Sequence, residues 1–374
     1  MTAALRTVPG RVLIVGGGLA GSLLAILLAR RGLAPCVIER SSEEESRTPS
    51  GGRSINLALA ARGIAALERA GVRADVDPLL IPMRGRSVHE PGEVPRFLPY
   101  GQRRGEEIYS VPRATLNGLL QRLARERFGV EYRYRHTCVG VDADAASVIV
   151  KSPAGRETLG ADAIFAADGA GSVVRRSIAA TGAIDAREEL LDHGYVELTI
   201  PARGGDFALR PDALHIWPRG GFMLIALPNP DRSFTATLFL PLNGEPSFEA
   251  LRESGLRDFF AAEFADALPL IPELGDDARQ RERTLGTLGT VYCSPWSFRG
   301  RILLIGDAAH AIVPFHGQGM NAAFEDCAVL DALLASHDPR WPGVFDAFER
   351  RRADDAAAIA VMAIENYREM RDSV

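Results

Sequence analysis

The first forty residues alternate between apolar runs and a glycine-rich break. Arg11 to Val15 predicts a buried strand, Leu19 to Arg31 has the length and apolar content of a buried helix, and Pro35 to Glu39 predicts a second strand. Two parallel strands joined by a helix form the repeating unit of a doubly wound sheet. The pattern therefore predicts an α/β fold.

Further along the chain the pattern changes. Three apolar runs separated by Pro, Gly, Asn and Asp predict an antiparallel sheet, at Leu214–Trp217, Phe222–Leu227 and Phe234–Leu240. Elsewhere we predict a loop at Ser41–Gly52, helices at Ile64–Ala70, Arg113–Phe128 and Gly319–Leu334, and strands at Glu131–Cys138, Ser147–Lys151 and Arg301–Ile305.

The antiparallel runs interrupt the α/β pattern, so the sequence predicts a second domain inserted into the first. A chain of 374 residues has room for two or three domains of roughly 100 to 200 residues each. We predict a first domain from residues 1–75, 104–183 and 293–350, a second from 76–103 and 184–292, and a C-terminal helix over 351–374.

Composition and charge narrow the function classes. With 47% hydrophobic and 24% charged residues, the chain has the composition of an ordinary globular protein. Its net charge of −5 argues against a nucleic-acid binder, which needs a basic surface to displace counterions. Small molecules are therefore the expected partners.

Cysteine spacing and hydropathy indicate the compartment. The four cysteines lie far apart with no CxxC pair, so we predict no metal site, no disulfide framework and a cytoplasmic location. Val12 to Ala29 is uncharged and nearly long enough to cross a bilayer, but glycines interrupt it early. A buried strand, a glycine turn and a helix explain this segment better than a membrane span.

Gly16, Gly18 and Gly21 form a GxGxxG motif directly after the first strand. The first allows a tight turn, the second lets a pyrophosphate approach the backbone, and the third allows close packing of the helix on the sheet. Glu39 ends the second strand, where an acid can accept hydrogen bonds from ribose hydroxyls. The motif predicts a dinucleotide site without distinguishing NAD from FAD.

Two later motifs favour FAD. Asp168 and Gly169 end an apolar strand before a helix, an arrangement that by itself also fits a plain N-cap. Asp307 follows the strand Arg301–Ile305 and precedes a glycine-rich turn at Gly317–Asn321. FAD explains this second site, because its ribityl chain and flavin ring extend far beyond the first phosphate site. Asp307 can hold a ribityl hydroxyl, and backbone N–H groups of the turn can face the flavin N1 and C2 carbonyl.

The order GxGxxG, Asp-Gly and GDxxxxxxP resembles the aromatic-ring hydroxylase branch of the flavoprotein monooxygenases. Within that branch, the chain resembles the kynurenine 3-monooxygenase family along essentially its whole length. The matching stretches are GRSINLALAARG (52–63), IPMRGR (81–86), LHIWPRGGFMLIALPNPDRSFTATLFLP (214–241), GDAAHAIVPFHGQGMNAAFEDC (306–327) and ENYREMRDSV (365–374). The resemblance implies a Rossmann-like, glutathione-reductase-like FAD-binding domain with an inserted antiparallel β-sheet substrate domain and a C-terminal helix.

The resemblance also implies a reaction. In this family NADPH reduces a noncovalently bound FAD, O2 adds at flavin C4a, and the hydroperoxide hydroxylates L-kynurenine to 3-hydroxykynurenine. Two alternatives stay open: the same chemistry on a substituted kynurenine or an anthranilate in a biosynthetic pathway, or a flavin-containing redox or scaffold protein that does not hydroxylate. A monomer or homodimer is expected.

The resemblance assigns the substrate residues. Arg86, Tyr100 and Asn366 would clamp the substrate carboxylate, and arginine suits this role because its fork donates two parallel hydrogen bonds. By itself, Arg86 would be read as a surface salt-bridge partner. The apolar walls would come from Leu214, Met223, Ile225, Phe239, Pro314 and Phe315. His316 would assist proton movement, although a structural role fits it equally well.

The resemblance also extends the FAD site beyond Gly16, Gly18, Gly21, Glu39, Asp168 and Asp307. The added residues are Ala20, Ile38, Arg40, Ser41, Ala58, Arg113, Cys138, Gly317, Gly319, Met320 and Asn321. From its position alone, Arg113 would be a helix-start arginine that faces water.

One departure from the family concerns the C-terminus. Family members continue for tens of residues into a helical segment that helps to close the substrate site and, in eukaryotes, anchors a membrane. This sequence stops at Val374. We therefore expect no membrane anchor in this chain and either a truncated C-terminal helix or a more open pocket.

Overall fold

A computed structural model describes residues 11–47, 56–103, 105–142, 144–145, 147–275, 285–336 and 340–372. The predicted strand, helix and strand at its start are β1 (Val12–Val15), α1 (Leu19–Arg30) and β2 (Pro35–Ile38). The segment that is nearly long enough to cross a bilayer is therefore a buried strand, a turn and a helix. In the described ranges, no helix combines the length and apolar character that a membrane span requires.

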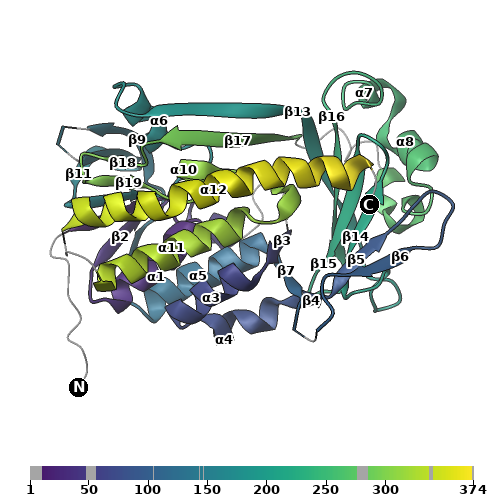
Figure 1. The fold of residues 1–374 in the computed structure, drawn as a ribbon, viewed down its shortest axis with the longest axis horizontal. Helices are drawn as coiled ribbons and strands as arrows, with labels where there is room; N and C mark the ends of the chain where they lie inside the picture. The colour runs from purple at the N-terminus through teal and green to yellow at the C-terminus, as the bar shows by residue number, and fades with distance from the viewer. Residues whose placement is uncertain are drawn as a thin grey trace.

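A six-stranded sheet forms the centre of the α/β part (Figure 1). Its order is β18 (Ser297–Phe298), β19 (Ile302–Leu304), β12 (Ala163–Ala166), β1, β2 and β8 (Glu131–Arg133). All pairs are parallel except β18 with β19. Because helices cover a parallel sheet, its central strands are apolar throughout, and β1, β2, β12 and β19 are entirely buried.

Helices and small sheets surround this sheet. Helix α1 packs against α3 (Ala61–Ala70), α5 (Arg113–Glu126) and α11 (Gly319–Ser336). One three-stranded sheet contains β3 (Asn56–Leu59), β7 (Ile108–Pro112) and β4 (Ile81–Met83), and another contains β11 (Gly155–Gly160), β10 (Ser147–Ser152) and β9 (Thr137–Asp142). The short helices are α2 (Glu43–Arg47), α4 (Arg73–Val76), η2 (Asp77–Leu79), α6 (Val173–Ala179), α7 (Leu251–Ser254), α8 (Leu256–Glu263), η3 (Leu268–Leu270), η4 (Pro272–Gly275), α10 (Asp307–His310) and η5 (Pro314–His316).

The three apolar runs of the middle region lie side by side in a seven-stranded sheet. Its order is β17 (Gly286–Ser294), β13 (Asp185–Ile200), β16 (Phe234–Pro241), β15 (Met223–Pro228), β14 (Ala213–Pro218), β5 (Gly85–Val88) and β6 (Arg96–Pro99). The three runs pair antiparallel, as predicted, whereas β14 also pairs in parallel with β5, a strand that the pattern did not predict. These two strands are far apart along the chain, so no tight hairpin forces them to run in opposite directions.

Three predicted elements also differ from the structure. The single strand predicted at Glu131–Cys138 is two strands in different sheets, β8 and β9. The chain turns between them at Arg135, whose φ is 57°. The loop predicted at 41–52 contains α2, because Ser42 and Glu45 form a reciprocal capping box between side chains and backbone N–H groups; residues 48–52 lie outside the described residues.

The C-terminal helix α12 (Trp341–Asp372) begins well before the predicted residue 351. It packs along α11 and touches β18 at one end and β14 at the other (Figure 1). This helix therefore connects the six-stranded and seven-stranded sheets. The boundaries of the two predicted domains stay predictions.

Candidate active site

The glycine turn after β1 has the shape that a pyrophosphate site requires. Gly16 has a φ of +101°, and a Cβ at this position would lie 2.4 Å from the Ala167 carbonyl oxygen. A Cβ on Gly21 would lie 2.0 Å from the Gly16 carbonyl oxygen. Gly18, by contrast, faces open space at the N-terminus of α1 and has no side-chain cap. Free space beside the positive end of a helix fits a phosphate group.

Glu39 holds this turn at the carboxyl ends of β1 and β2. Its carboxylate accepts hydrogen bonds from the backbone N–H groups of Gly17 (2.7 Å) and Ser41 (2.8 Å). A carboxylate has about four acceptor positions, so ribose hydroxyls can still bind to it. Arg40 is exposed beside it. The Ile38 side chain is buried in the core, so only its backbone is left to face a cofactor.

Asp168 acts as a helix cap. Its carboxylate accepts hydrogen bonds from the Ser172 hydroxyl (2.6 Å) and the Val173 backbone N–H (2.8 Å) at the start of α6. Ser172 is itself the N-cap of α6, and Asp168 supports it, which agrees with the N-cap reading that the sequence also allowed. An FAD contact of Asp168 stays a prediction. Cys138 is buried nearby, and burial raises the pKa of its thiol to about 11. Such a thiol stays protonated at neutral pH and can only line a site.

Asp307 has the opposite character. It is half-buried at the first position of α10, directly after β19 and Gly306. No described residue donates a hydrogen bond to its carboxylate, so its acceptor positions are available. A partly buried carboxylate with open acceptor positions at the end of a parallel strand fits a ribityl hydroxyl.

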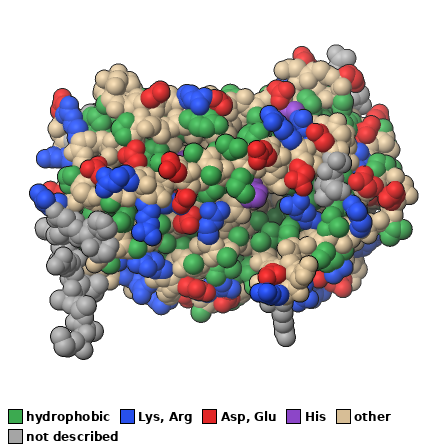
Figure 2. Space-filling view, viewed as in Figure 1, with side chains coloured by type: hydrophobic (Ala, Val, Ile, Leu, Met, Phe, Trp, Pro, Cys, Tyr) green, Lys and Arg blue, Asp and Glu red, His purple; other side chains and the backbone are tan. Residues whose placement is uncertain are grey.

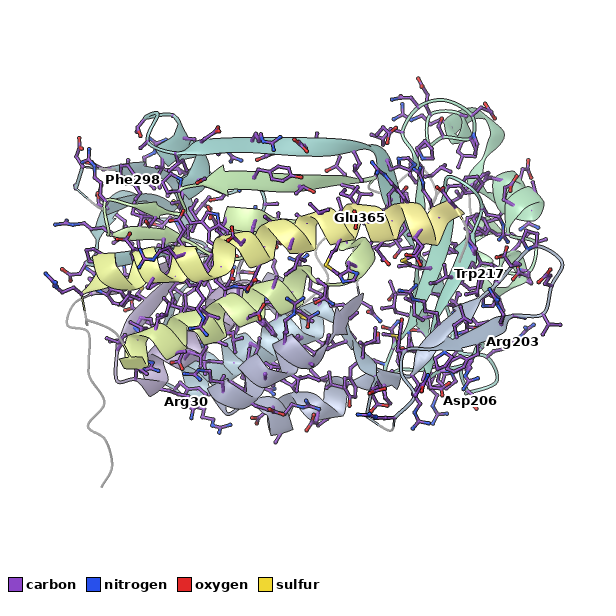
Figure 3. The ribbon with its side chains drawn as sticks, in the orientation of Figure 1. Arg30, Arg203, Asp206, Trp217, Phe298 and Glu365 are labelled. Carbon is purple, nitrogen blue, oxygen red and sulfur yellow. The ribbon has the colours of Figure 1, made fainter. Side chains whose placement is uncertain are left out.

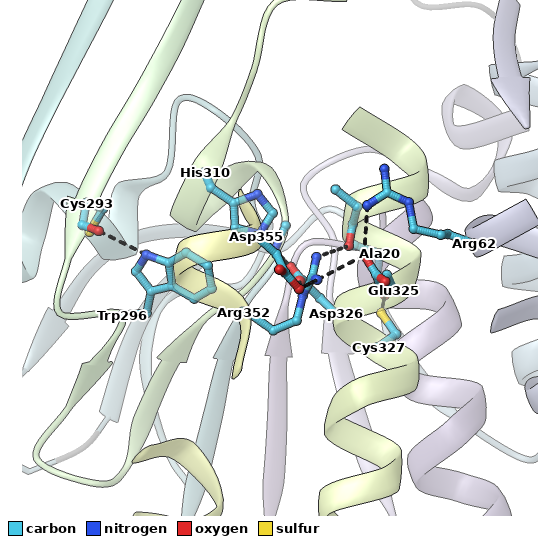
Figure 4. A network of polar contacts seen from close by, with 12 residues as sticks. Ala20, Arg62, Cys293, Trp296, His310, Glu325, Asp326, Cys327, Arg352 and Asp355 are labelled. Carbon is cyan, nitrogen blue, oxygen red and sulfur yellow. Dashed lines mark hydrogen bonds and ion pairs between the residues drawn. The ribbon is translucent and has the colours of Figure 1, made fainter. Parts of the chain in front are cut away.

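A buried ion-pair network fixes the turn that carries Asp307 (Figure 4). Asp326 on α11 accepts hydrogen bonds from the Gly306 backbone N–H (3.0 Å), the His310 ring (2.6 Å) and Arg352 Nε (2.7 Å). Burial by itself would raise the pKa of Asp326, but the neighbouring His310 and Arg352 outweigh it and lower that pKa. Sequence reasoning missed Asp326 and Arg352, because only the fold brings these distant residues together.

The loop from η5 into α11 is fixed by Asn321. Its Oδ1 accepts the Ala60 backbone N–H (2.8 Å), and its Nδ2 donates to the carbonyls of Ala58 (2.8 Å) and Gly317 (2.9 Å). The side chain is thus occupied by bonds to protein, and only backbone N–H groups of this loop are left to face a flavin. Among the other predicted FAD residues, Met320 is buried, Ala20 and Gly319 are half-buried, and Arg113 is exposed at the start of α5.

Five of the six predicted wall residues meet in one apolar cluster, which joins β14, β15, β16, η5 and α12. Phe315 packs edge-on against Phe239 at 4.9 Å between ring centroids and stacks on Tyr367 at 3.7 Å. From the sequence alone, Tyr367 was not assigned to the substrate walls. The cluster members are Ile216, Met223, Phe239, Leu288, Val313, Phe315, Ala363, Tyr367 and Met370, with Leu214 and Ile225 packed against them. The sixth residue, Pro314, is exposed.

Arg86 lies beside this cluster on β5, paired in register with Leu214. Its guanidinium carbon is 5.8 Å from the centre of the Tyr100 ring. The Arg86 Nε is buried and has no hydrogen-bond partner, and no acidic side chain of the described residues forms an ion pair with Arg86. Burial raises the pKa of Tyr100, while Arg86 opposes the increase. With no acidic partner among the described residues, the Arg86 guanidinium can bind an anionic group.

Two more predicted residues, Asn366 and His316, lie at η5. The Asn366 Nδ2 donates to the Phe315 carbonyl oxygen at 2.6 Å, which ties α12 to η5. Figure 3 shows Glu365, its neighbour, on the length of α12 that approaches the seven-stranded sheet carrying Trp217. His316 is half-buried, and burial together with the charges of Arg62 and Arg86 lowers its pKa. The His316 imidazole is therefore neutral at pH 7.

A family model described as an FAD binding domain matches residues 10–363. A kynurenine 3-monooxygenase from Xanthomonas euvesicatoria pv. vesicatoria (strain 85-10) is 48% identical over 371 residues, which cover 98% of this chain and 80% of the relative. One from Myxococcus xanthus (strain DK1622) is 45% identical over 366 residues, which cover 97% and 78%.

Solved structures confirm the predicted fold class. A tetrameric form of 2-methyl-3-hydroxypyridine-5-carboxylic acid oxygenase superposes with a TM-score of 0.77 and 22% identity, over 94% of this chain and 89% of that one. The tetracycline destructase Tet(51) gives 0.68 and 16%, over 96% and 91%. At these identities the likeness shows the fold alone. With the sequence relatives, however, the identification is direct: the chain belongs to the kynurenine 3-monooxygenase family of FAD-binding proteins.

Proposed function

We propose that this protein hydroxylates L-kynurenine to 3-hydroxykynurenine. One molecule each of NADPH, O2 and substrate, with one proton, would yield the hydroxylated product, NADP+ and water. The observation that carries the proposal is Arg86, whose buried Nε has no hydrogen-bond partner in the described part of the chain. A substrate carboxylate would supply the missing acceptor and neutralise the charge.

Bound FAD would supply the redox chemistry, because protein side chains alone neither take up a hydride from NADPH nor activate O2 for ring hydroxylation. The residues that would hold it are the Gly16–Gly21 turn for the diphosphate, Glu39 for the ribose and Asp307 for the ribityl chain. The open space at Gly18 and the free acceptor positions of Asp307 support this assignment.

The apolar cluster would position the aromatic ring and exclude water from the reacting face. Phe239 and Phe315 already meet at an edge-to-face angle of 63°, so they offer flat surfaces to a ring. Arg86, Tyr100 and Asn366 would hold the amino-acid tail, which fixes the ring relative to these walls. Such positioning is the main contribution that side chains make in a cofactor-dependent enzyme.

His316 would move a proton during the reaction. Its lowered pKa keeps the imidazole neutral near pH 7, and a neutral ring can accept a proton at one nitrogen and donate one at the other. We assign His316 this role because of its lowered pKa and because it directly follows Phe315.

Mass spectrometry of the product formed from L-kynurenine, NADPH and O2 tests the proposal. We expect a gain of one oxygen atom and faster NADPH oxidation when kynurenine is added. A product only from a substituted kynurenine or an anthranilate would favour the first alternative. No hydroxylated product from any of these aromatics would favour a redox or scaffold role.

We further propose a monomer or homodimer in the cytoplasm. All four cysteines, Cys36, Cys138, Cys293 and Cys327, are free, which suits a reducing compartment. Acidic and basic side chains are interspersed over the face drawn in Figure 2, as expected for a protein whose partners are small molecules. Light scattering of the purified protein would test the oligomeric state.

A further inference from the structure

We propose that Asn117 is an additional FAD-binding residue, whose carboxamide bonds the polar chain of the cofactor. This inference rests on the FAD-dependent function proposed above. The observation is that the Asn117 Oδ1 is shielded from solvent and has no hydrogen-bond partner among the residues that the structure describes. Buried polar atoms nearly always have a partner, because an unsatisfied one loses its bonds to water without replacement.

The position of Asn117 on α5 indicates what the partner is. Arg113, Asn117 and Gln121 follow at four-residue intervals, so they share one face of the helix. Gln121 fixes the direction of that face, since its Nε2 donates to the Gly17 carbonyl in the glycine turn at 2.6 Å. Helices α1 and α5 pack against each other over this region.

Asn117 lies one helical turn, about 5.4 Å, from Gln121 toward the start of α5. On this face of α5, Asn117 therefore lies between Gln121, which contacts the glycine turn, and Arg113, the residue that the family resemblance assigns to FAD. The Gln121 carboxamide is occupied, since its Oε1 also accepts the Tyr134 hydroxyl at 2.9 Å. The Asn117 carboxamide has no hydrogen bond to a described residue, so it is available to bind a ligand.

Two parts of FAD fit the carboxamide. The Oδ1 can accept a hydrogen bond from a ribose or ribityl hydroxyl, and in the opposite amide orientation the Nδ2 can donate to a phosphate oxygen. Asn117→Asp separates them. It keeps an acceptor for a hydroxyl but places a negative charge beside a phosphate, so it should bind FAD better than Asn117→Ala in the first case and worse in the second.

The test is titration of flavin-free protein with FAD, followed by the quenching of flavin fluorescence. We expect Asn117→Ala and Asn117→Leu to raise the Kd for FAD about tenfold, the equivalent of one hydrogen bond. Thr115→Ala, an exposed change on the same helix, should leave the Kd unchanged.

A second measurement excludes a merely structural role. Because an unpartnered buried acceptor is unfavourable, Asn117→Leu should leave the melting temperature of the flavin-free protein unchanged or raise it, while lowering the increase that FAD produces. A lower melting temperature without FAD, together with an unchanged Kd, would overturn the inference. Wild-type protein that binds no FAD would instead overturn the proposed function itself.

Discussion

The carboxylate of Asp326 lies 2.6 Å from the Nε2 of His310, and both side chains are buried. The same carboxylate accepts the Gly306 backbone N–H, so the two ends of the turn that contains Asp307 are fixed to one point on α11. Arg352 completes the network from α12 (Figure 4). The C-terminal helix is therefore linked through buried charges to the turn that we assign to the ribityl chain.

Replacing Asp326 should affect both stability and flavin affinity. Asp326→Asn removes the only fully buried carboxylate among the three described ones that pair with Arg352, while the more exposed Glu325 and Asp355 remain. Breaking a buried ion pair costs up to about 3 to 5 kcal/mol. Urea unfolding measures the loss, and FAD titration below the transition measures the affinity. Asp331→Asn is the matched control, because Asp331 is a buried acid of α11 that pairs with Arg31 and Arg69 instead. The control should lose stability but keep its FAD affinity; equal effects on affinity would contradict the assignment.

His310 should make the free energy of unfolding depend on pH above 6.5. Burial by itself would lower its pKa, yet the attraction of Asp326 outweighs burial and raises it above 6.5. A raised folded-state pKa contributes stability that is complete below pH 6.5 and is lost as the pH rises through the raised value. The free energy of unfolding of the wild type, minus that of His310→Gln, should therefore fall from pH 6.5 upward. A difference that does not change with pH would refute this coupling.

His215 should make the protein less stable at acidic pH, the opposite of the pH dependence expected for His310. Burial lowers its pKa from 6.5 to about 4, and it forms hydrogen bonds with His89 (2.9 Å) and the Arg210 carbonyl (2.8 Å). Its contribution is present above pH 6.5 and is lost as the pH falls toward 4, by about 3 kcal/mol. Unfolding curves measure this: between pH 7 and pH 5 the wild type should lose more stability than His215→Gln. The same pH dependence in both proteins would show that His215 does not titrate as stated.

Arg86 should affect substrate binding and leave FAD binding unchanged. Arg86→Ala removes a charge-assisted hydrogen bond worth about 1.5 to 3 kcal/mol, so the Kd for kynurenine should rise about tenfold or more. Changes in flavin absorbance on titration with kynurenine measure this. Arg84→Ala is the control, because Arg84 is two residues away on the exposed side and faces Glu107 at 3.6 Å. An unchanged kynurenine Kd in Arg86→Ala would move the carboxylate clamp elsewhere.

Asp307 should matter for flavin retention. Its carboxylate has no hydrogen-bond donor among the described residues, so Asp307→Ala removes no hydrogen bond of that carboxylate to the described part of the protein. We expect about tenfold weaker FAD binding, equivalent to one hydrogen bond, and little change in the stability of the flavin-free protein. Asp307→Asn keeps one acceptor oxygen, so its affinity for FAD should lie between those of the wild type and Asp307→Ala. Wild-type affinity in Asp307→Ala would reject the ribityl assignment.

The geometry of the glycine turn that we assign to FAD was predictable because its signals are local. The turn at Gly16 needs a positive φ, and Gly21 must let the helix approach the strand, so the glycine spacing alone specifies strand, turn and helix. The capping box of Ser42 and Glu45 was equally local and was overlooked. The roles of Ile38 and Asn321 were not predictable, since burial in the core and bonding to Ala58 and Ala60 depend on distant chain segments.

Local sequence patterns specify the order of elements, the glycine turn after β1 and the apolar runs of the second sheet, because periodicity and turn chemistry act over a few residues. Which buried groups meet depends on how the whole elements pack. This packing pairs β14 with β5, places Tyr367 on Phe315, and joins Asp326 to Arg352. These contacts connect residues far apart in sequence, and only the packing of whole elements brings them within hydrogen-bond or stacking distance.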